Sequence, residues 1–147
     1  MYKHILISTD GSSVAQRGVD HGLSLAKALG ARVTIVTATE HLSSSAVMSG
    51  WTPSPNEMAS YEANQTETAS KVLAAAKAAA DKIGVEAETV HVKNAFPADA
   101  ILATAEERHC SLIAMSSHGR RGLERILVGS QTAEVLARSH VPVLVIR

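Results

Sequence analysis

A glycine-containing stretch from Met115 to Ser130 holds the residues of this chain best suited to bind an anion. Gly119, Gly122 and Gly129 permit unusual backbone angles and let a ligand approach backbone N–H groups closely. Gly129 and Ser130 open a helical pattern, and the first N–H groups of a helix attract anions together with its positive dipole end. Charge or further hydrogen bonds could come from His118, Arg120 and Arg121. The pattern predicts a phosphate-binding loop. The alternative is an ordinary helix cap beside a solvated basic surface.

Other chemical sites are poorly supported by the sequence. It contains neither G-x-x-x-x-G-K-[ST] nor G-x-G-x-x-G, and its seven histidines lack metal-ligand spacing. Asp10, Ser12 and His118 could converge as a catalytic triad, but there is no G-x-S-x-G elbow, and such residues commonly cap helices. Cys110 opens an apolar strand, which favours an inert core residue over a nucleophile.

Composition favours a single globular domain spanning residues 1–147, in which small aliphatic residues build the core. Hydrophobic residues make up 46% of the chain, and aromatic residues only 3%. The 14 basic and 14 acidic residues balance, so no overall field attracts nucleic acid or a membrane surface. The single cysteine, the lack of a signal-peptide pattern and the lack of a long apolar run together predict a cytoplasmic protein.

Strand and helix patterns alternate along the chain, which predicts a single open five-stranded parallel sheet with helices on both faces. Strands are expected at residues 4–8, 32–38, 85–92, 111–115 and 141–146, and helices from the Ser13 cap to residue 29 and at 56–83, 97–109 and 130–139. In such open sheets ligands bind beyond the carboxyl ends of the strands, where the strand order reverses. The loops expected to carry function are 9–12, 38–55 and 116–130.

Several local signals define the expected helix ends and helix packing. Ser13 and Gln16 fit a capping box at the start of the first helix. Gly30 is a natural stop for that helix. Gly18 and Gly22 lie one turn apart, which would let this helix approach the sheet closely.

Three segments carry a family resemblance: residues 2–12 (YKHILISTDGS), 112–130 (LIAMSSHGRRGLERILVGS) and 141–147 (VPVLVIR). Together they resemble the universal stress protein family along the whole chain. The resemblance implies a Rossmann-like fold of the adenine nucleotide alpha hydrolase type. It also implies a homodimer in which the edge strand, Val141 to Ile146, pairs antiparallel with its twin. An exposed apolar edge is a template for such pairing, although Pro142 partly blunts it.

The ATP-binding branch of that family carries a glycine, two residues, a second glycine, nine residues, and then Gly-Ser or Gly-Thr. Gly119 matches the second glycine here, residues 120–128 supply the nine, and Gly129 with Ser130 completes the pattern. Ser116 replaces the first glycine, and Ser8 stands where a proline commonly precedes Thr-Asp. We expect these departures to weaken or adjust nucleotide binding rather than abolish it.

The resemblance implies a role for each matched position. Asp10, with Thr9 beside it, is expected to face the ribose or the base, although Asp10 could equally be a helix N-cap. Ala38 is expected to touch adenine, and Met115 to line the adenine or ribose pocket. The phosphates, bridged by Mg²⁺, are expected to lie among Gly119, Gly129, Ser130 and Gln131, with His118 and Arg120 nearby. Ser116 is expected to lie close to the phosphate or the ribose.

The sequence therefore predicts a dimeric regulator of stress responses that binds ATP and acts on a protein partner of unknown identity. The main alternative is a nucleotide-independent dimeric scaffold or chaperone-like protein, which Ser8 and Ser116 favour. A third alternative is an ATP-consuming enzyme. No residue offers a dedicated general base, so at most slow ATP hydrolysis or autophosphorylation is expected.

Overall fold

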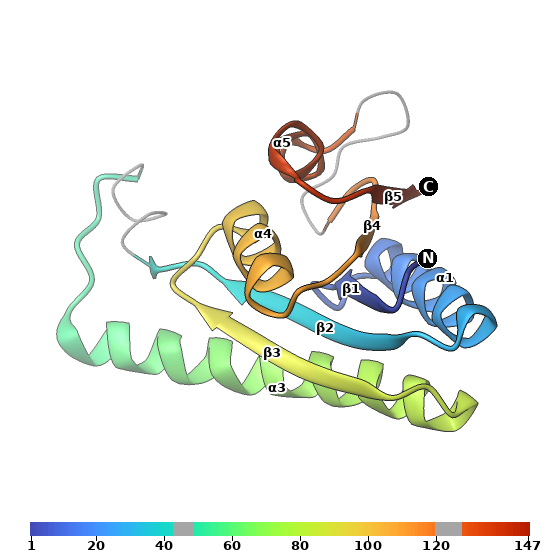
Figure 1. Ribbon diagram of the computed structural model, residues 1–147. Helices are drawn as coiled ribbons and strands as arrows, with labels where there is room; N and C mark the ends of the chain where they lie inside the picture. The colour runs from blue at the N-terminus through green and yellow to red at the C-terminus, as the bar shows by residue number, and fades with distance from the viewer. Residues whose placement is uncertain (43–48, 120–127) are drawn as a thin grey trace.

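The computed structural model describes residues 1–42, 49–119 and 128–147 (Figure 1). The strands are β1 (His4–Ser8), β2 (Arg32–Thr39), β3 (Ala87–Lys93), β4 (Leu112–Ser116) and β5 (Val143–Ile146). The helices are α1 (Ser13–Leu29), α3 (Pro55–Ile83), α4 (Pro97–Glu107) and α5 (Ser130–Arg138). The alternation of strand and helix follows the order expected from the sequence.

The five strands form one parallel sheet in the order β3-β2-β1-β4-β5, which confirms the predicted fold class. The chain builds outward from β1 to β3, then crosses back to place β4 on the other side of β1. The strand order therefore reverses between β1 and β4. In an open parallel sheet this is the point where ligands bind.

Some predicted boundaries were wrong by one or two residues. The third strand begins at Ala87 instead of residue 85, and the last strand begins at Val143 instead of 141. Pro142 has no N–H to donate to a strand ladder, which accounts for the late start of β5. The third helix ends at Glu107 instead of His109, because His109 has a positive φ of 51° that an α-helix cannot hold.

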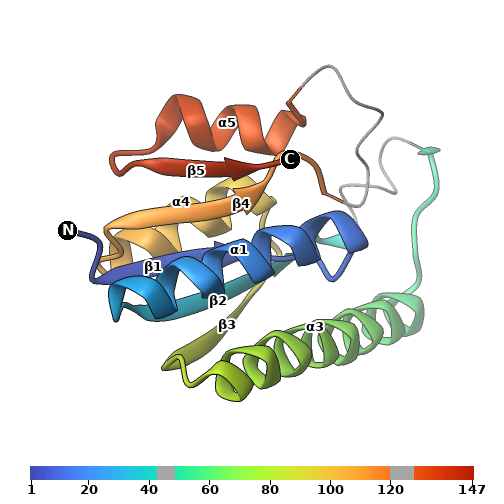
Figure 2. The ribbon, with the colours of Figure 1, turned by 90° about the vertical axis from the view of Figure 1, so that its right-hand side faces the viewer.

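Helices cover both faces of the sheet. Helices α1 and α3 pack on one face, while α4 and α5 lie on the other (Figures 1 and 2). Alternate residues of β1 point to opposite faces, so Ile5 and Ile7 belong to the core under α1 and α3. Leu6 belongs to the second core, together with Ile113 and Met115 of β4 and residues of α4 and α5.

Two glycines bring α1 against the sheet, as the sequence predicts. A Cβ atom on Gly18 would lie 3.0 Å from the backbone nitrogen of Ser116. A Cβ atom on Gly22 would lie 2.7 Å from Cδ1 of Ile7, a fully buried side chain. The absence of side chains at both positions therefore sets the distance between α1 and the strands β1 and β4.

The predicted end of α1 at Gly30 is confirmed, but the predicted N-cap of α1 is wrong. Gly30 has a positive φ of 62°, and its N–H donates back to the last turn of α1. Ser12, one residue before the predicted Ser13, caps α1 by accepting a hydrogen bond from the backbone nitrogen of Ala15 at 3.1 Å. The Gln16 amide instead donates to Asp20.

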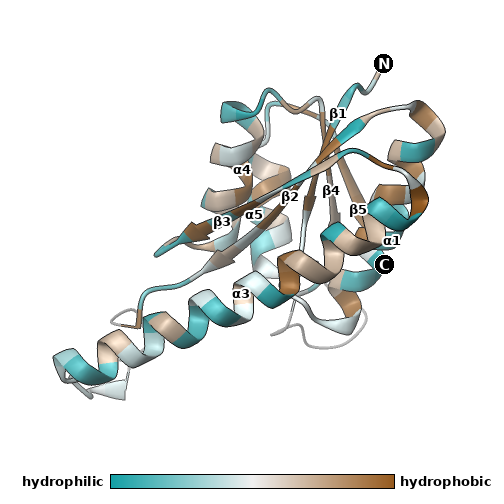
Figure 3. Cartoon of the chain, turned by 90° about the horizontal axis from the view of Figure 1, so that it is seen from below, coloured by the Kyte–Doolittle hydropathy of each residue, from teal (hydrophilic) through white to brown (hydrophobic). Residues whose placement is uncertain are grey.

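Helix α3 begins with a capping box that was not predicted from the sequence. Ser54 and Glu57 exchange hydrogen bonds, and Pro55 occupies the first helical position. Its buried residues are Ala69, Leu73, Ala76 and Ala80, all in the C-terminal half. The N-terminal half is largely hydrophilic and extends beyond the sheet (Figure 3). This extension places α3 beside the carboxyl ends of the strands.

A polar cluster lies at the opposite end of the sheet, where β1, β2 and β3 begin; His4 and Thr34 are buried and Glu88 is exposed. The Oγ1 atom of Thr34 donates to Oε1 of Glu88 at 2.7 Å, and it lies 2.7 Å from Nε2 of His4. Because the single hydroxyl proton goes to Glu88, Nε2 of His4 must donate to Thr34. His4 is only 5% exposed, and burial lowers the pKa of His4; the positive charge of Arg32 lowers it further.

We expect this histidine to make the fold less stable in mild acid. Below about pH 6.5 the unfolded chain binds a proton at His4 that the folded chain takes up only at lower pH, so the free energy of unfolding falls as pH falls. The melting temperature should therefore drop more between pH 7.5 and 5.5 in the natural protein than in His4→Gln, whose amide can still donate to Thr34. Parallel curves for the two proteins would contradict this assignment. His91, whose pKa burial also lowers, is present in both and cancels.

Candidate functional site

A cavity of about 330 Å³ opens beyond the carboxyl ends of the strands, at the point where the strand order reverses. Its volume falls within the range of small-molecule sites. The wall on one side comes from α3. The end of β2, the loops after β1 and β4, the first turns of α4 and α5, and Ala15 of α1 supply the rest. The residues that line it therefore come from seven separate parts of the chain.

The loop after β1 places Asp10 in the cavity wall and fixes its carboxylate. Oδ1 of Asp10 accepts a hydrogen bond from the backbone nitrogen of Ser12 at 2.9 Å, and Oγ1 of Thr9 accepts from the nitrogen of Gly11 at 3.1 Å. The alternative in which Asp10 is the N-cap of α1 is wrong, because Ser12 holds that position. The Asp10 carboxylate instead lies beside Gly119, in the loop after β4.

The loop after β4 is held by its own hydrogen bonds. The Ser116 hydroxyl donates to the carbonyl oxygen of His118 at 2.6 Å, and Oγ of Ser117 lies 3.0 Å from Nδ1 of His118. From α5, the Thr132 hydroxyl reaches back to the carbonyl oxygens of Ser116 and Ser117 at 3.1 and 3.2 Å. The first turn of α5 is thereby attached to the end of β4.

At two glycines of this loop there is little room for a side chain. A Cβ atom on Gly119 would lie 2.8 Å from Oδ2 of Asp10, and one on Gly129 would lie 3.2 Å from the carbonyl oxygen of Ser117. The backbone nitrogen of Gly129 donates to that same oxygen at 2.9 Å. Gly129 is also the N-cap of α5 and provides no side-chain cap, so the first N–H groups of α5 are not capped by their own N-cap residue.

The structure brings together ten of the eleven residues expected from the sequence to form the site. These are Thr9, Asp10, Ala38, Met115, Ser116, His118, Gly119, Gly129, Ser130 and Gln131. The eleventh, Arg120, lies outside the described residues. Their placement around one cavity agrees with the predicted geometry, while the role of each toward a ligand stays a prediction.

The wall formed by α3 was not predicted from the sequence. Tyr61, Gln65, Thr68 and Val72 line the cavity at helical spacing. The Tyr61 hydroxyl donates to the carbonyl oxygen of Glu40 at 3.4 Å, and the Gln65 amide donates to the Tyr61 oxygen at 2.9 Å. The three- and four-residue spacing was a usable signal, but nothing in the sequence indicated that this face of α3 meets a cavity.

The two nucleophile hypotheses find no support in the geometry. Asp10 and His118 line the cavity, but the hydrogen bond from Ser12 to Asp10 comes from the backbone nitrogen, and the Ser12 hydroxyl caps α1. Cys110 is buried, and burial raises the pKa of its thiol to about 11, so the thiol is protonated at neutral pH. Among the described residues, no group of three His, Cys, Asp or Glu side chains could hold a metal ion.

Comparison with known proteins decides the family. The sequence profile of the Universal stress protein family matches residues 1–147. This chain belongs to that family. The universal stress protein MJ0531 of Methanocaldococcus jannaschii is 33% identical over 150 residues, which cover all of this chain and 83% of that protein. The cavity described above therefore lies in a universal stress protein domain, as the sequence resemblance implied.

Solved structures of similar proteins agree with this fold. The protein MJ0577, whose structure served as a test case for assigning biochemical function, superposes with a TM-score of 0.80 at 27% identity and covers 99% of this chain and 96% of its own. A universal stress protein in complex with cAMP superposes with a TM-score of 0.71 at 25% identity and covers 99% and 97%. At least one similar universal stress protein thus binds an adenine nucleotide.

Within residues 1–42, 49–119 and 128–147, no helix is both long enough and apolar enough to cross a membrane. The longest helix, α3, is rich in charged and polar residues along its exposed side.

Proposed function

We propose that this universal stress protein is a regulator that binds an adenine nucleotide, ATP with Mg²⁺, in the cavity between β1 and β4. The observation that carries this proposal is the junction, in one cavity, of Asp10 with a glycine-bounded loop and the first turn of α5, whose N-cap is a glycine without a side-chain cap. A carboxylate suits the hydroxyls of a ribose. N–H groups at a helix start suit phosphate oxygens. A nucleotide needs both.

The two ends of the cavity differ in the way that a nucleotide requires. The base would lie against small and apolar side chains, which include Val36, Ala38, Ile101 and Met115. The phosphates would lie at Gly119 and at the Gly129–Ser130 turn, where the helix dipole of α5 favours negative charge. The cAMP complex of a similar protein supports an adenine nucleotide as the ligand class.

Ser116 stands where the ATP-binding branch has a glycine, and its geometry bears on the alternative function. Its side chain is 7% exposed, and its hydroxyl donates to His118 within the loop. The hydroxyl is thus occupied in stabilising the turn after β4. This arrangement favours retained nucleotide binding over the nucleotide-independent scaffold.

We expect Ser116→Ala to lower stability more than affinity. Loss of one buried hydrogen bond should reduce the free energy of unfolding by about 1 to 2 kcal/mol. The dissociation constant for the nucleotide should change by less than about threefold, since the hydroxyl is turned to the His118 carbonyl. Urea unfolding and calorimetric titration measure the two quantities. A large loss of affinity at unchanged stability would instead make Ser116 a direct ligand contact.

Thermal unfolding with and without millimolar Mg-ATP tests the proposal. A ligand present at about 100 times its dissociation constant stabilises the native state by about 2.7 kcal/mol, which shifts the melting temperature of a domain this size by several degrees. Mg-GTP and Mg²⁺ alone are the controls for base recognition and for the ion. No shift with any adenine nucleotide would refute the proposal and leave the dimeric scaffold or chaperone-like function.

We also propose that the protein is a homodimer through β5. This strand is at the edge of the sheet, and Leu144 on it is 38% exposed, with Leu136 of α5 46% exposed. An exposed apolar edge favours pairing, and two-fold symmetry would pair β5 antiparallel with its copy. Sedimentation at high micromolar concentration should show a dimer. A monomer under those conditions would refute this part of the proposal.

A further inference from the structure

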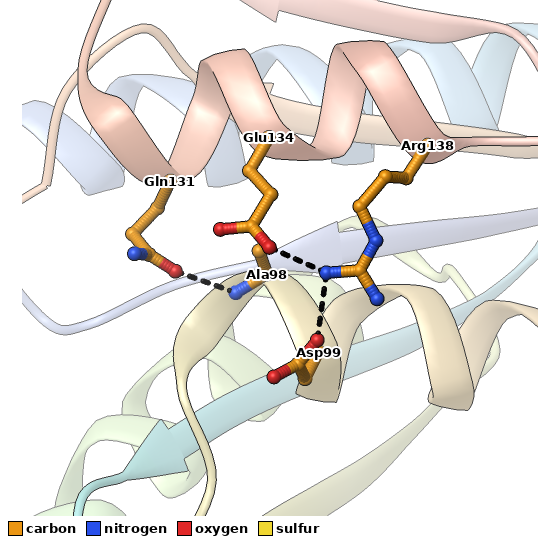
Figure 4. Close-up of polar contacts among 5 residues, drawn as sticks. All are labelled: Ala98, Asp99, Gln131, Glu134 and Arg138. Atoms are coloured by element: carbon orange, nitrogen blue, oxygen red, sulfur yellow. Dashed lines mark hydrogen bonds and ion pairs between the residues drawn. The ribbon is translucent and has the colours of Figure 1, made fainter.

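Helix α4 is capped by a residue of α5. Phe96, the N-cap of α4, makes no side-chain cap hydrogen bond, and Pro97 at the first helical position has no N–H. The next nitrogen, that of Ala98, donates to Oε1 of Gln131 at 2.9 Å (Figure 4). Because Ala98 is fully buried, this nitrogen depends on Gln131 for its hydrogen bond. A side chain in the cavity wall therefore joins the first turns of α4 and α5.

This hydrogen bond fixes the polarity of the Gln131 amide. A backbone N–H can only donate, so the group facing Ala98 must be the side-chain oxygen and not the NH₂ group. The NH₂ group lies on the other side, away from Ala98 (Figure 4). Gln131 is half-buried and lines the cavity, so the end of the side chain left for a ligand is a hydrogen-bond donor with no acceptor capacity.

We infer that Gln131 determines specificity through this fixed polarity: α4 holds its oxygen, and its NH₂ group selects an unprotonated acceptor, such as a phosphate oxygen, at the phosphate end of the cavity. The inference rests on the proposed function and extends it, because it assigns two tasks to the Gln131 side chain: the cap of α4 and the recognition of the ligand. A free glutamine could rotate its amide by half a turn, whereas rotation here would turn the NH₂ group toward the Ala98 N–H and uncap α4.

Glutamate and methionine substitutions separate the two tasks. In Gln131→Glu one carboxylate oxygen still accepts from Ala98 at the favourable end of α4, but the donor is replaced by an acceptor. In Gln131→Met both the cap and the donor are lost with little change in volume. The matched control is Arg138→Gln, which removes a second contact between α4 and α5. Nη1 of Arg138 lies 2.8 Å from Oδ1 of Asp99 and also pairs with Glu134 (Figure 4). None of these three residues lines the cavity.

Each variant is examined without ligand by thermal unfolding and with AMP and adenosine by calorimetric titration. Gln131→Met, which adds no charge, separates loss of the donor from charge repulsion in Gln131→Glu. We expect Gln131→Glu to keep the melting temperature of the natural protein and to bind AMP at least tenfold more weakly. Gln131→Met should lose both stability and AMP affinity, and Arg138→Gln should keep its AMP affinity. Adenosine affinity should change by less than about twofold throughout, because adenosine has no phosphate for the amide to bind.

The possible failures are distinguishable. If the natural protein binds none of Mg-ATP, AMP and adenosine, the proposed function fails. The role of Gln131 as the cap of α4 is then tested by the melting temperatures without ligand. Equal values for Gln131→Met and the natural protein would refute that role. If the natural protein binds AMP and Gln131→Glu binds it equally well, the recognition role is wrong while the proposed function stands. If both Gln131 variants weaken AMP and adenosine alike, the residue acts only on the structure.

Discussion

Replacing Gly18 by valine should lower the free energy of unfolding by about 2 to 3 kcal/mol, because the added side chain meets the backbone of β4. Its Cβ atom alone would lie 3.0 Å from the backbone nitrogen of Ser116 and 3.4 Å from the carbonyl carbon of Met115. Backbone atoms in a central strand cannot move aside as the end of a side chain can. Helix α1 must therefore move away from the sheet. Urea unfolding of the two proteins measures the effect.

The control for this prediction is Arg17→Val, at an exposed position of the same helix. It introduces the same β-branched residue without contact with the sheet, and helix propensity alone should cost no more than about 0.7 kcal/mol. Equal losses for the two variants would mean that Gly18 is not required for close packing. Strand β4 ends at the cavity with Ser116, which Gly18→Val would displace. The variant should therefore also weaken nucleotide binding.

Replacing Gly129 by valine should reduce nucleotide affinity by at least tenfold while the fold is retained. The new Cβ atom would lie 3.2 Å from the carbonyl oxygen of Ser117 and 3.6 Å from Cα of His118, and the remaining methyl groups need further space. The start of α5 must shift relative to the loop after β4. Phosphate binding by backbone N–H groups depends on that placement, so calorimetric titration with Mg-ATP should show the loss.

Ala133→Val is the matched control for the Gly129 variant. Ala133 is exposed on α5, one turn beyond Gly129, and its nitrogen donates to the Gly129 carbonyl within the helix. The substitution places the same side chain on the same helix outside the cavity, so nucleotide affinity should be unchanged. If Gly129→Val binds Mg-ATP as tightly as the natural protein, the phosphates do not lie at the start of α5.

The sequence was sufficient for the fold because its signals are local and agree with one another. Apolar strand segments alternate with helical segments, and Gly30 and Gly84 end two helices with a positive φ that other residues rarely adopt. Once a parallel sheet is expected, the carboxyl ends of the strands are the place for a ligand. Ten of the eleven expected site residues could be placed around one cavity for this reason.

The features that could not be predicted depend on contacts between distant segments. The cap on α4 joins Ala98 to Gln131, 33 residues apart, and only the packing of α4 against α5 reveals it. The α3 wall depends on how α3 lies over the loop after β1, where a Cβ atom on Gly11 would meet Val72 at 2.5 Å. Even the cap of α1 required the structure, since Ser12 and Ser13 are chemically identical and differ only in backbone geometry.

The most direct test of the central claim is to map backbone amide chemical shifts during a titration with Mg-ATP. We expect the largest shifts at residues 9–10, 37–40, 115–116, 118–119 and 129–132, which border the cavity between β1 and β4. We expect little change around His4, Thr34 and Glu88, at the other end of the sheet. Shifts centred on that distant cluster, or none at millimolar nucleotide, would contradict a nucleotide site at the reversal of the strand order.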